Sequence, residues 1–578
     1  MAFERAANWL TDCVEHDDKC KSEESHFMPR RLLNVGSAQE PCGPYLFEPK
    51  MSANYVCLSY CWGADTEGVL KTTKQTLDDH YRAIPYDRLP PTIRDAVIVC
   101  RHLGVPYLWV DSLCIVQDDE LSWLEDSRDM HKIYLNCHFT IAAQEPTSCK
   151  LGFLGRQRYG DPKWQQKFTT ECPIEGEPVA TKIHNRVSRR RRAINHPIEG
   201  EPSTIEVFIR PDIVEYSKDD SFSFSLDTRG WCLQESLLPR RKLCFNGNEM
   251  SWECHRRRIC ECGHLRWAPS SVYGRLGASI KSKMGPPKRR WWDPQPGRRG
   301  EDWRTLVQDY AGRHLTQPTD KLTALSGLAQ TIAEANRKAD GTSDKYWAGL
   351  WSAEFLHDLT WRVKHPRATR VCSSNYRAPT WSWASIDGPV EYKCSEMVST
   401  WKYKAEKEYE STVNTVVCNP CLADDPTGPI TSAYAVLTGP MVSIDPAVLL
   451  AGLDDTKIFL DEPIASNVQG VDGKAKSPMD QWYGNQRCDT DGNAHSIYCF
   501  RLFILRGHTG KVYGDGTERI LGPVTWFLVL RKCLGKEDTY ERIGVGVTEI
   551  SISDVEMTRI DDEGSLFHKA GLSTVTII

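Results

Sequence analysis

The chain has 578 residues, of which 40% are hydrophobic and 26% are charged, and its formal net charge is −5. This composition is typical of globular proteins and excludes a largely disordered or fibrous chain. The slightly acidic balance also argues against a dedicated nucleic-acid-binding protein, whose domain would be clearly basic. At roughly 150 residues per domain, the length predicts two to four domains.

Cysteine content and the N-terminus indicate the cellular compartment. The 22 cysteines are too few for a disulfide scaffold. The first 18 residues are charged and lack the apolar core of a signal peptide. No stretch reaches the roughly 18 consecutive apolar residues of a membrane span. We therefore expect a soluble, cytoplasmic protein with reduced thiols and no membrane partner.

Strands alternate with helices in the first part of the chain. Short apolar runs typical of buried strands cover residues 55–60, 107–110 and 138–143. A helix is predicted from Pro91 to just before Gly104, and a longer amphipathic helix precedes the third run. This alternation predicts an α/β fold with a mostly parallel sheet. Ligands of such sheets bind at the carboxyl ends of the strands, where Ser59, Tyr60 and Asp111 stand.

The rest of the chain is predicted to contain an insertion, a linker, a helical region and a mostly β region, in this order. An insertion with an arginine run is expected to be an exposed loop, and Pro-, Gly- and Arg-rich residues mark a linker. Helical periodicity follows, and then short apolar runs separated by Gly, Pro and Asp. The predicted divisions are an N-terminal segment (1–50), a domain (51–265) with an insertion at about 155–225, a linker or long loop (266–300), a helical region (301–375) and a mostly β region (376–578).

Three motifs, in this order, resemble the HET (heterokaryon incompatibility) domain of filamentous fungi. The first is YVCLSYCWG at residues 55–63, the second extends over residues 89–143, and the third is RGWCLQE at residues 229–235. Departures are small: cysteine replaces the usual alanine at positions 57 and 137 and the usual threonine at position 232. The resemblance implies a role in non-self recognition and programmed cell death.

HET domains are similar in turn to TIR domains, some of which hydrolyse NAD. Residues 231–235 (WCLQE) are similar to the Trp-Cys-x-x-Glu stretch of TIR domains, although Ser236 stands where those domains have leucine. The likeness implies a TIR-like, flavodoxin-like core, with Glu235 as the catalytic carboxylate and NAD as a substrate rather than a cofactor. It also implies a substrate-binding set made up of Ser59, Tyr60, Trp62, Gly63, Asp111, Arg229 and Trp231.

Each of these residues also has a purely structural interpretation. Glu235 is as well suited to an ion pair with Arg240, and Asp111 to an ion pair with Arg229. Large aromatic residues more often belong to the core than to a pocket. The sequence therefore leaves open a second hypothesis: a non-catalytic HET module that signals by self-association or by docking to a recognition or signalling partner.

Other chemistries receive weaker support. Cys254, Cys260, Cys262 and His264 have ligand types that suit zinc, but their spacing is not that of a usual zinc finger, so no metal is predicted. Cys114 as a thiol nucleophile stays open, although its apolar neighbours favour an inert buried thiol. The chain contains no P-loop motif and no Gly-x-Ser-x-Gly elbow.

Overall fold

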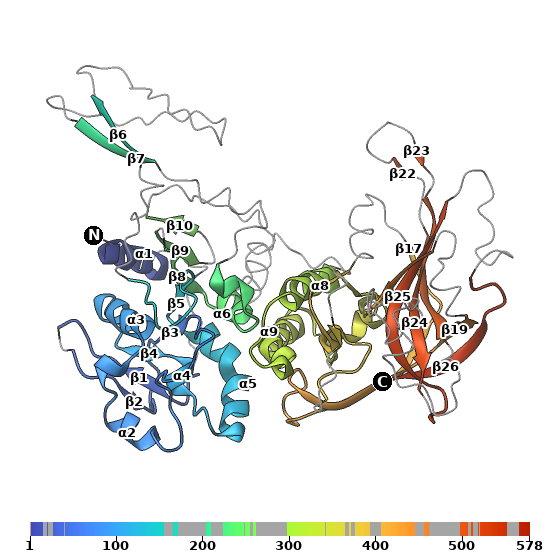
Figure 1. Ribbon diagram of the computed structural model, residues 1–578, viewed down its shortest axis with the longest axis horizontal. Helices are drawn as coiled ribbons and strands as arrows, with labels where there is room; N and C mark the ends of the chain where they lie inside the picture. Colours follow the sequence, from blue (N-terminus) through green and yellow to red (C-terminus); the bar gives the residue numbers. More distant parts are fainter. Residues whose placement is uncertain are drawn as a thin grey trace, which may run out of the picture.

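The computed structural model has an α/β domain, a mostly helical middle region and a β domain, which follow one another along the long axis (Figure 1). It describes residues 2–15, 20, 27–39, 41–154, 166–171, 204–209, 224–247, 249–254, 258–261, 298–341, 343–364, 369–370, 376–392, 406–445, 456–461, 497–506, 510–511, 518–519, 521–533, 535–551 and 566–578. Among these residues, no helix has the length and apolar character that a membrane crossing requires.

The first domain is built on an eight-stranded sheet of order β10-β9-β8-β5-β3-β4-β1-β2. The central strands β4, β3, β5 and β8 are parallel, and the outer strands are antiparallel. In chain order these parallel strands lie 2-1-3-4, which matches the first four strands of the 2-1-3-4-5 order. The predicted α/β class with a parallel core is therefore confirmed. The bounds are β1 Leu32–Asn34, β2 Tyr45–Phe47, β3 Val56–Ser59, β4 Tyr107–Trp109, β5 Phe139–Ala143, β8 Arg241–Phe245, β9 Met250–Cys254 and β10 Arg258–Cys260.

Helices cover both faces of this sheet. Figure 1 shows α1 and α3 on one side of the strands and α5 and α6 on the other. Apolar residues at helical spacing bury one face of α3, whose core residues include Ile93, Val97 and Cys100. The bounds are α1 Ala2–Glu15, α2 Leu77–Arg82, η1 Tyr86–Arg88, α3 Pro91–His102, α4 Asp111–Cys114, α5 Glu120–Asn136, η3 Ser225–Thr228 and α6 Cys232–Leu237.

The sheet extends beyond the predicted start of the domain at residue 51. Strands β1 and β2 come from the segment predicted to be peripheral, and β1 pairs directly with β4. With only three residues each, they are too short to show any periodicity in the sequence. Within the predicted insertion, β6 (Gln166–Glu171) and β7 (Thr204–Ile209) pair with each other, apart from the main sheet (Figure 1). The arginine run at residues 189–192 and the predicted linker up to residue 297 lie outside the described residues.

The middle region begins with two helices, α8 (Arg298–Ala311) and α9 (Thr323–Asp340). Short elements and several buried tryptophans then form a compact unit, in which Trp303 and Trp383 both donate a hydrogen bond to the carbonyl oxygen of Gly349. The remaining elements are η4 Pro318–Lys321, β11 Tyr346–Trp347, β12 Leu350–Trp351, η5 Ser352–Glu354, α10 Phe355–Asp358, β13 Arg362–Val363, β14 Thr369–Arg370, η6 Trp383–Ser385, β15 Ile386–Asp387 and β16 Val390–Glu391.

The C-terminal region is mostly β, as predicted. Strands β19, β21, β24, β25 and β26 pair in a closed ring, because β19 contacts both β26 and β21. Closure removes the exposed edges of these strands. The bounds are β17 Glu406–Tyr409, β18 Thr412–Pro420, β19 Ile430–Ile444, β20 Thr456–Leu460, β21 Ile497–Arg506, β22 Gly510–Lys511, β23 Glu518–Arg519, β24 Leu521–Lys532, β25 Thr539–Ser551 and β26 Gly571–Ile577.

Helix α9 of the middle region packs directly against α5 and α6 of the first domain. At this contact Gly327 lies so close to its neighbours that a Cβ atom there would approach the Cβ of His131 to 2.3 Å. The middle region therefore lies against the part of the first domain that carries Glu235.

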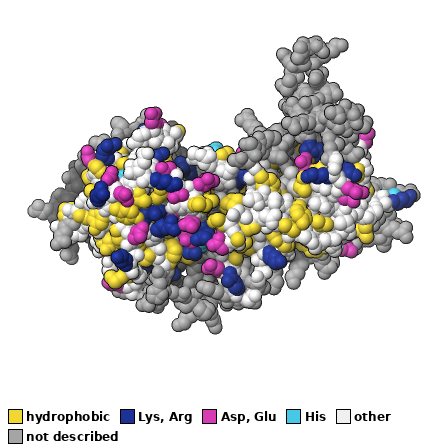
Figure 2. All heavy atoms as spheres, turned by 90° about the horizontal axis from the view of Figure 1, so that it is seen from below, with side chains coloured by type: hydrophobic (Ala, Val, Ile, Leu, Met, Phe, Trp, Pro, Cys, Tyr) yellow, Lys and Arg dark blue, Asp and Glu magenta, His cyan; other side chains and the backbone are white. Residues whose placement is uncertain are grey.

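Seen from below, side chains of both charge signs are interspersed with hydrophobic ones on the same face (Figure 2).

Candidate functional site

Glu235 lies on α6 above the carboxyl end of β3. The hydroxyl of Ser59, the last residue of β3, donates a 2.5 Å hydrogen bond to Oε2 of Glu235. Both side chains are buried, with 6% of Glu235 and 3% of Ser59 exposed. Because β3 and β5 are the first and third parallel strands in chain order, Glu235 lies at the point where the winding of the sheet reverses direction. This is where doubly wound sheets bind their ligands.

A small hollow of about 20 Å³, about enough for one water molecule, opens beside Glu235. Most of its lining groups are polar and come from β3, β5, α6 and β8, among them Ser59, Gln144 and Lys242. The Nζ of Lys242 donates to Ser236 at 2.8 Å and pairs with Glu253 at 3.2 Å. The Oε1 of Gln144 is buried and accepts no hydrogen bond from any described residue. The hollow therefore combines a carboxyl group with a buried acceptor that has no described donor.

Burial raises the pKa of Glu235 from 4.5 to about 7. The hydrogen bond from Ser59 lowers this pKa, the nearby charge of Asp111 raises it, and the positive charge of Arg229 lowers it. Near neutral pH, Glu235 is therefore present in both its protonated and its ionised form. A carboxyl pKa shifted by burial and by specific charges, beside a hollow, is a physical signature of functional sites.

Asp111 follows β4 and occupies the neighbouring position at the same sheet edge. Its two carboxylate oxygens accept hydrogen bonds from Trp62 Nε1 at 2.8 Å and from the Ser112 backbone N–H at 2.7 Å. The hydroxyl of Tyr60 donates to the Ser112 hydroxyl at 2.9 Å. Burial raises the pKa of Asp111, and the donors around it lower it. These groups form a second polar cluster whose oxygens are already bonded within the protein.

Two other predicted residues are close to this edge. Arg229 is half-buried, and its charge lowers the pKa values of Glu235 and Asp111, so it links the two clusters electrostatically. Gly63 has φ +101°, and a Cβ atom there would lie 2.6 Å from the Ser148 hydroxyl. A glycine is required at this position because the loop after β3 packs tightly against the loop after β5.

Trp231 lies at the start of α6 but is directed toward the middle region. Its indole N–H donates a 3.2 Å hydrogen bond to Asp320 of η4, and its ring packs edge-on against Trp123 of α5. The backbone beside it is also bonded to the middle region, since Gly230 N–H donates to His314 and His314 N–H donates to Thr228. The structure therefore brings Ser59, Glu235 and Arg229 together, whereas Trp231 joins two regions of the fold.

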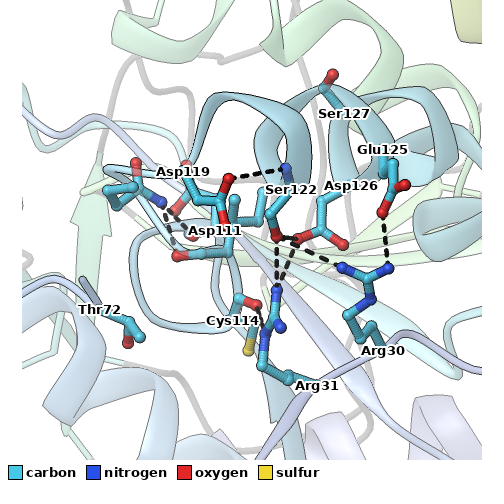
Figure 3. A network of polar contacts seen from close by, with 12 residues as sticks. Arg30, Arg31, Thr72, Asp111, Cys114, Asp119, Ser122, Glu125, Asp126 and Ser127 are labelled. Atoms are coloured by element: carbon cyan, nitrogen blue, oxygen red, sulfur yellow. Dashed lines mark hydrogen bonds and ion pairs between the residues drawn. The ribbon is translucent and has the colours of Figure 1, made fainter. Parts of the chain in front are cut away.

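Buried polar contacts position the segment that follows Asp111 (Figure 3). Arg31, just before β1, donates to the Cys114 carbonyl oxygen at 2.7 Å and pairs with Asp126 of α5 at 2.8 Å. The Gln117 side chain donates to the Asp111 carbonyl oxygen at 3.0 Å. These bonds fix α4 and the start of α5 relative to the sheet.

Gln144 and Lys242 line the hollow but were not among the predicted site residues. Gln144 directly follows the apolar run that forms β5, so the carboxyl-end rule that selected Ser59 would also have selected it. Lys242 is hidden in an apolar strand and had no comparable signal. The thiol of Cys114 is buried, which raises its pKa to about 12, so it is protonated at neutral pH and poorly suited to nucleophilic attack.

Comparison with known proteins gave one result. Residues 55–235 match the family model described as heterokaryon incompatibility protein (HET). No curated protein and no solved structure matched the chain. The match ends at Glu235, so it contains the three motifs, Ser59, Gln144 and the polar groups around Asp111. Ser236, Lys242 and Glu253 lie beyond it.

Proposed function

We propose, from the premise that this chain is a heterokaryon incompatibility (HET) domain protein, that its HET domain hydrolyses the nicotinamide–ribose bond of NAD. The domain itself implies a role in heterokaryon incompatibility. The proposal rests on one observation: the carboxyl group of Glu235, bonded to Ser59, borders a polar hollow at the switch point of a parallel sheet. The similarity of residues 231–235 to a TIR motif gives that carboxyl group its suggested role.

The chemistry needs few protein groups. Cleavage of the bond between ribose C1′ and the nicotinamide nitrogen passes through a transition state like an oxocarbenium ion. Nicotinamide takes the bonding electron pair and leaves as a neutral ring, so no acid has to protonate it. Ionised Glu235 would offset the positive charge on the ribose and accept a proton from the water that bonds to C1′. The products are nicotinamide, ADP-ribose and a proton, which Glu235 passes to solvent.

The hollow is too small for the substrate itself. Its volume of about 20 Å³ holds about one water molecule, whereas ligand pockets usually measure roughly 300–1,000 Å³. We therefore propose that the hollow holds the water that bonds to ribose C1′, while NAD binds across its opening. The buried Oε1 of Gln144 would accept a hydrogen bond from this water.

A second candidate is a non-catalytic signalling module, in which the motifs serve the fold. The internal bonding of Tyr60, Trp62 and Asp111 favours it, because these side chains satisfy one another instead of facing the hollow. Death signalling would then proceed through self-association or through a protein partner.

The test is NAD consumption by the full-length protein. We would measure nicotinamide release at several protein concentrations, because an enzyme that works as an assembly gains specific activity as it is concentrated. We would then compare NAD levels and survival in yeast expressing the wild type, Glu235→Ala or Glu125→Gln at matched protein levels. Glu125 is a suitable control because its carboxylate is half-exposed and pairs with Arg30 on the surface.

We expect the wild type and Glu125→Gln to release nicotinamide and kill the host, and Glu235→Ala to do neither. Killing by all three proteins at constant NAD would overturn the enzymatic proposal in favour of the signalling module. Equal NAD loss with and without Glu235 would show that another group carries the reaction.

A further inference from the structure

Three buried cysteines meet in the first domain, and none of them lines the hollow. They are Cys13 on α1, Cys20 shortly after α1, and Cys254 at the end of β9. Their sulfur atoms all lie within 4.8 Å of one another. Their exposed fractions are 1%, 0% and 8%. Two distant parts of the chain therefore place three soft ligand atoms in one buried position.

The surrounding fold holds this arrangement in place. Helix α1 packs against β9. The guanidinium of Arg241, on the adjacent strand β8, donates to the carbonyl oxygen of Cys20 and to that of His138. The Arg5 side chain donates to the carbonyl oxygen of Glu261, just beyond β10. These bonds fix the N-terminal segment against the antiparallel edge of the sheet, with the three thiols between them.

The spacing of the sulfur atoms suits a tetrahedral ion. A Zn–S bond of about 2.3 Å and tetrahedral angles place two sulfur ligands about 3.8 Å apart. The sulfur atoms therefore need to approach one another by at most about 1 Å from the 4.8 Å upper limit to close the site around an ion. The buried thiol of Cys100 on α3 differs, because burial and the charge of Arg101 are the causes that shift its pKa, and no other thiol is among them.

Thiolate sulfur is a ligand that zinc prefers in proteins. A divalent ion bound here would displace the thiol protons into solvent and neutralise the charge of the resulting thiolates.

We propose that Cys13, Cys20 and Cys254 are ligands of a structural zinc ion that fastens helix α1 and Cys20 to strand β9. The three thiolates supply three of the four ligands that structural zinc usually takes. Zinc binding would release one proton from each thiol and change no oxidation state. The ion would act on the fold, and it takes no part in the proposed reaction at Glu235.

The experiment measures metal content in full-length protein expressed with zinc and purified under reducing conditions. Zinc per chain is determined by elemental mass spectrometry for the wild type, Cys20→Ser, Cys254→Ser and the control Cys100→Ser. Because the difference between proteins is the readout, zinc bound elsewhere on the chain does not affect the result. We expect each cluster variant to lose one equivalent relative to the wild type and to Cys100→Ser.

A second measurement avoids the problem of variants that fail to fold. Wild-type protein stripped of zinc and loaded with Co²⁺ should show thiolate-to-cobalt charge-transfer absorption, which added Zn²⁺ abolishes. Absence of this absorption together with unchanged zinc content in the variants would overturn the proposal. A disulfide among these cysteines in protein isolated without reductant, with no zinc bound after reduction, would also overturn it and would assign the cluster to redox chemistry.

Discussion

The indole Nε1 of Trp231 lies 3.2 Å from a carboxylate oxygen of Asp320, and this hydrogen bond joins the third HET motif to the middle region. Trp231 is four residues before Glu235 on the same short helical segment. The neighbouring backbone bonds between Gly230 and His314 strengthen the same junction. The position of the candidate catalytic carboxyl group therefore depends on contacts made outside residues 55–235.

Replacing Trp231 by phenylalanine should weaken this junction. The variant keeps most of the ring contacts with Trp123 but leaves the half-buried Asp320 carboxylate without the indole donor. Hydrogen bonds to charged groups contribute about 1.5–3 kcal/mol, so we expect a loss of about 2 kcal/mol in the free energy of unfolding, measured by urea denaturation with circular dichroism. Asp320→Asn retains an acceptor and should cost less; an equal or larger cost for Asp320→Asn would contradict this account.

Gly327 tests the packing between α9 and the first domain. An alanine there would bring its Cβ to 2.3 Å from His131 Cβ and 2.8 Å from Gln234 Oε1. Overpacking typically costs about 1–3 kcal/mol, which exceeds the roughly 1 kcal/mol that alanine gains over glycine in a helix. We therefore expect Gly327→Ala to lower the melting temperature. Gly312→Ala is the control, because the nearest atom to its new Cβ lies 3.5 Å away; equal effects of the two variants would refute the packing argument.

The burial of Glu235 should make stability depend on pH. Its pKa is about 7 in the folded chain against an ordinary value of 4.5, so the folded state binds more protons between these values. Stability therefore falls as the pH rises through this window, by up to about 3 kcal/mol above pH 7. The side chain of Glu235→Gln cannot ionise. The free energy of unfolding of this variant, measured by urea denaturation, should therefore equal that of the wild type at pH 4.5 and exceed it by about this amount at pH 8.5.

Ser59→Ala should change the free energy of unfolding at high pH in the opposite direction, in the same denaturation experiments. It removes the hydroxyl that donates to ionised Glu235. We expect it to be less stable than the wild type at pH 8.5 and closer to it at pH 4.5. A pH-independent difference for both variants would show that Glu235 does not titrate in this window.

Two adjacent arginines, Arg30 and Arg31, form ion pairs that differ in burial (Figure 3). The Arg31–Asp126 side chains are 6% and 11% exposed, whereas the Arg30–Glu125 side chains are 47% and 50% exposed. Removing one partner of a buried pair costs about 3–5 kcal/mol, because the other charge stays buried. An exposed pair contributes less than about 1 kcal/mol. In chemical denaturation, Arg31→Met should therefore be far more damaging than Arg30→Met; similar losses would show that burial does not set the difference.

The parts of the fold that could be predicted are those with local signals. Apolar runs and helical spacing predicted the parallel core, and the carboxyl-end rule placed Ser59 at the candidate site. The direction of Trp231 had no such signal, because its partner Asp320 lies in another region of the fold. Cys254 was assessed with its sequence neighbours Cys260 and Cys262, whereas its sulfur partners are on and near α1. Contacts between distant segments leave no periodicity in either segment.

Arg542 lies at the junction between the middle region and the β domain and contacts both. It is fully buried, pairs with Asp461 at 3.1 Å, and stacks on the ring of Trp361 with its guanidinium carbon 3.6 Å from the ring centroid. Its guanidinium also donates to the carbonyl oxygens of Leu359 and Trp361 at 2.6 and 2.5 Å. Lysine keeps the charge but cannot reproduce this planar set of donors.

We therefore expect Arg542→Lys to lower the free energy of unfolding by about 2–4 kcal/mol, because several hydrogen bonds to buried acceptors are lost at once. Limited proteolysis should release the β domain from the middle region at lower protease concentrations than in the wild type. Arg531→Lys is the matched control, since Arg531 pairs with Glu541 on the same pair of strands but is partly exposed. If the two lysine variants resist protease equally well, the carbonyl contacts of Arg542 do not hold the two regions together.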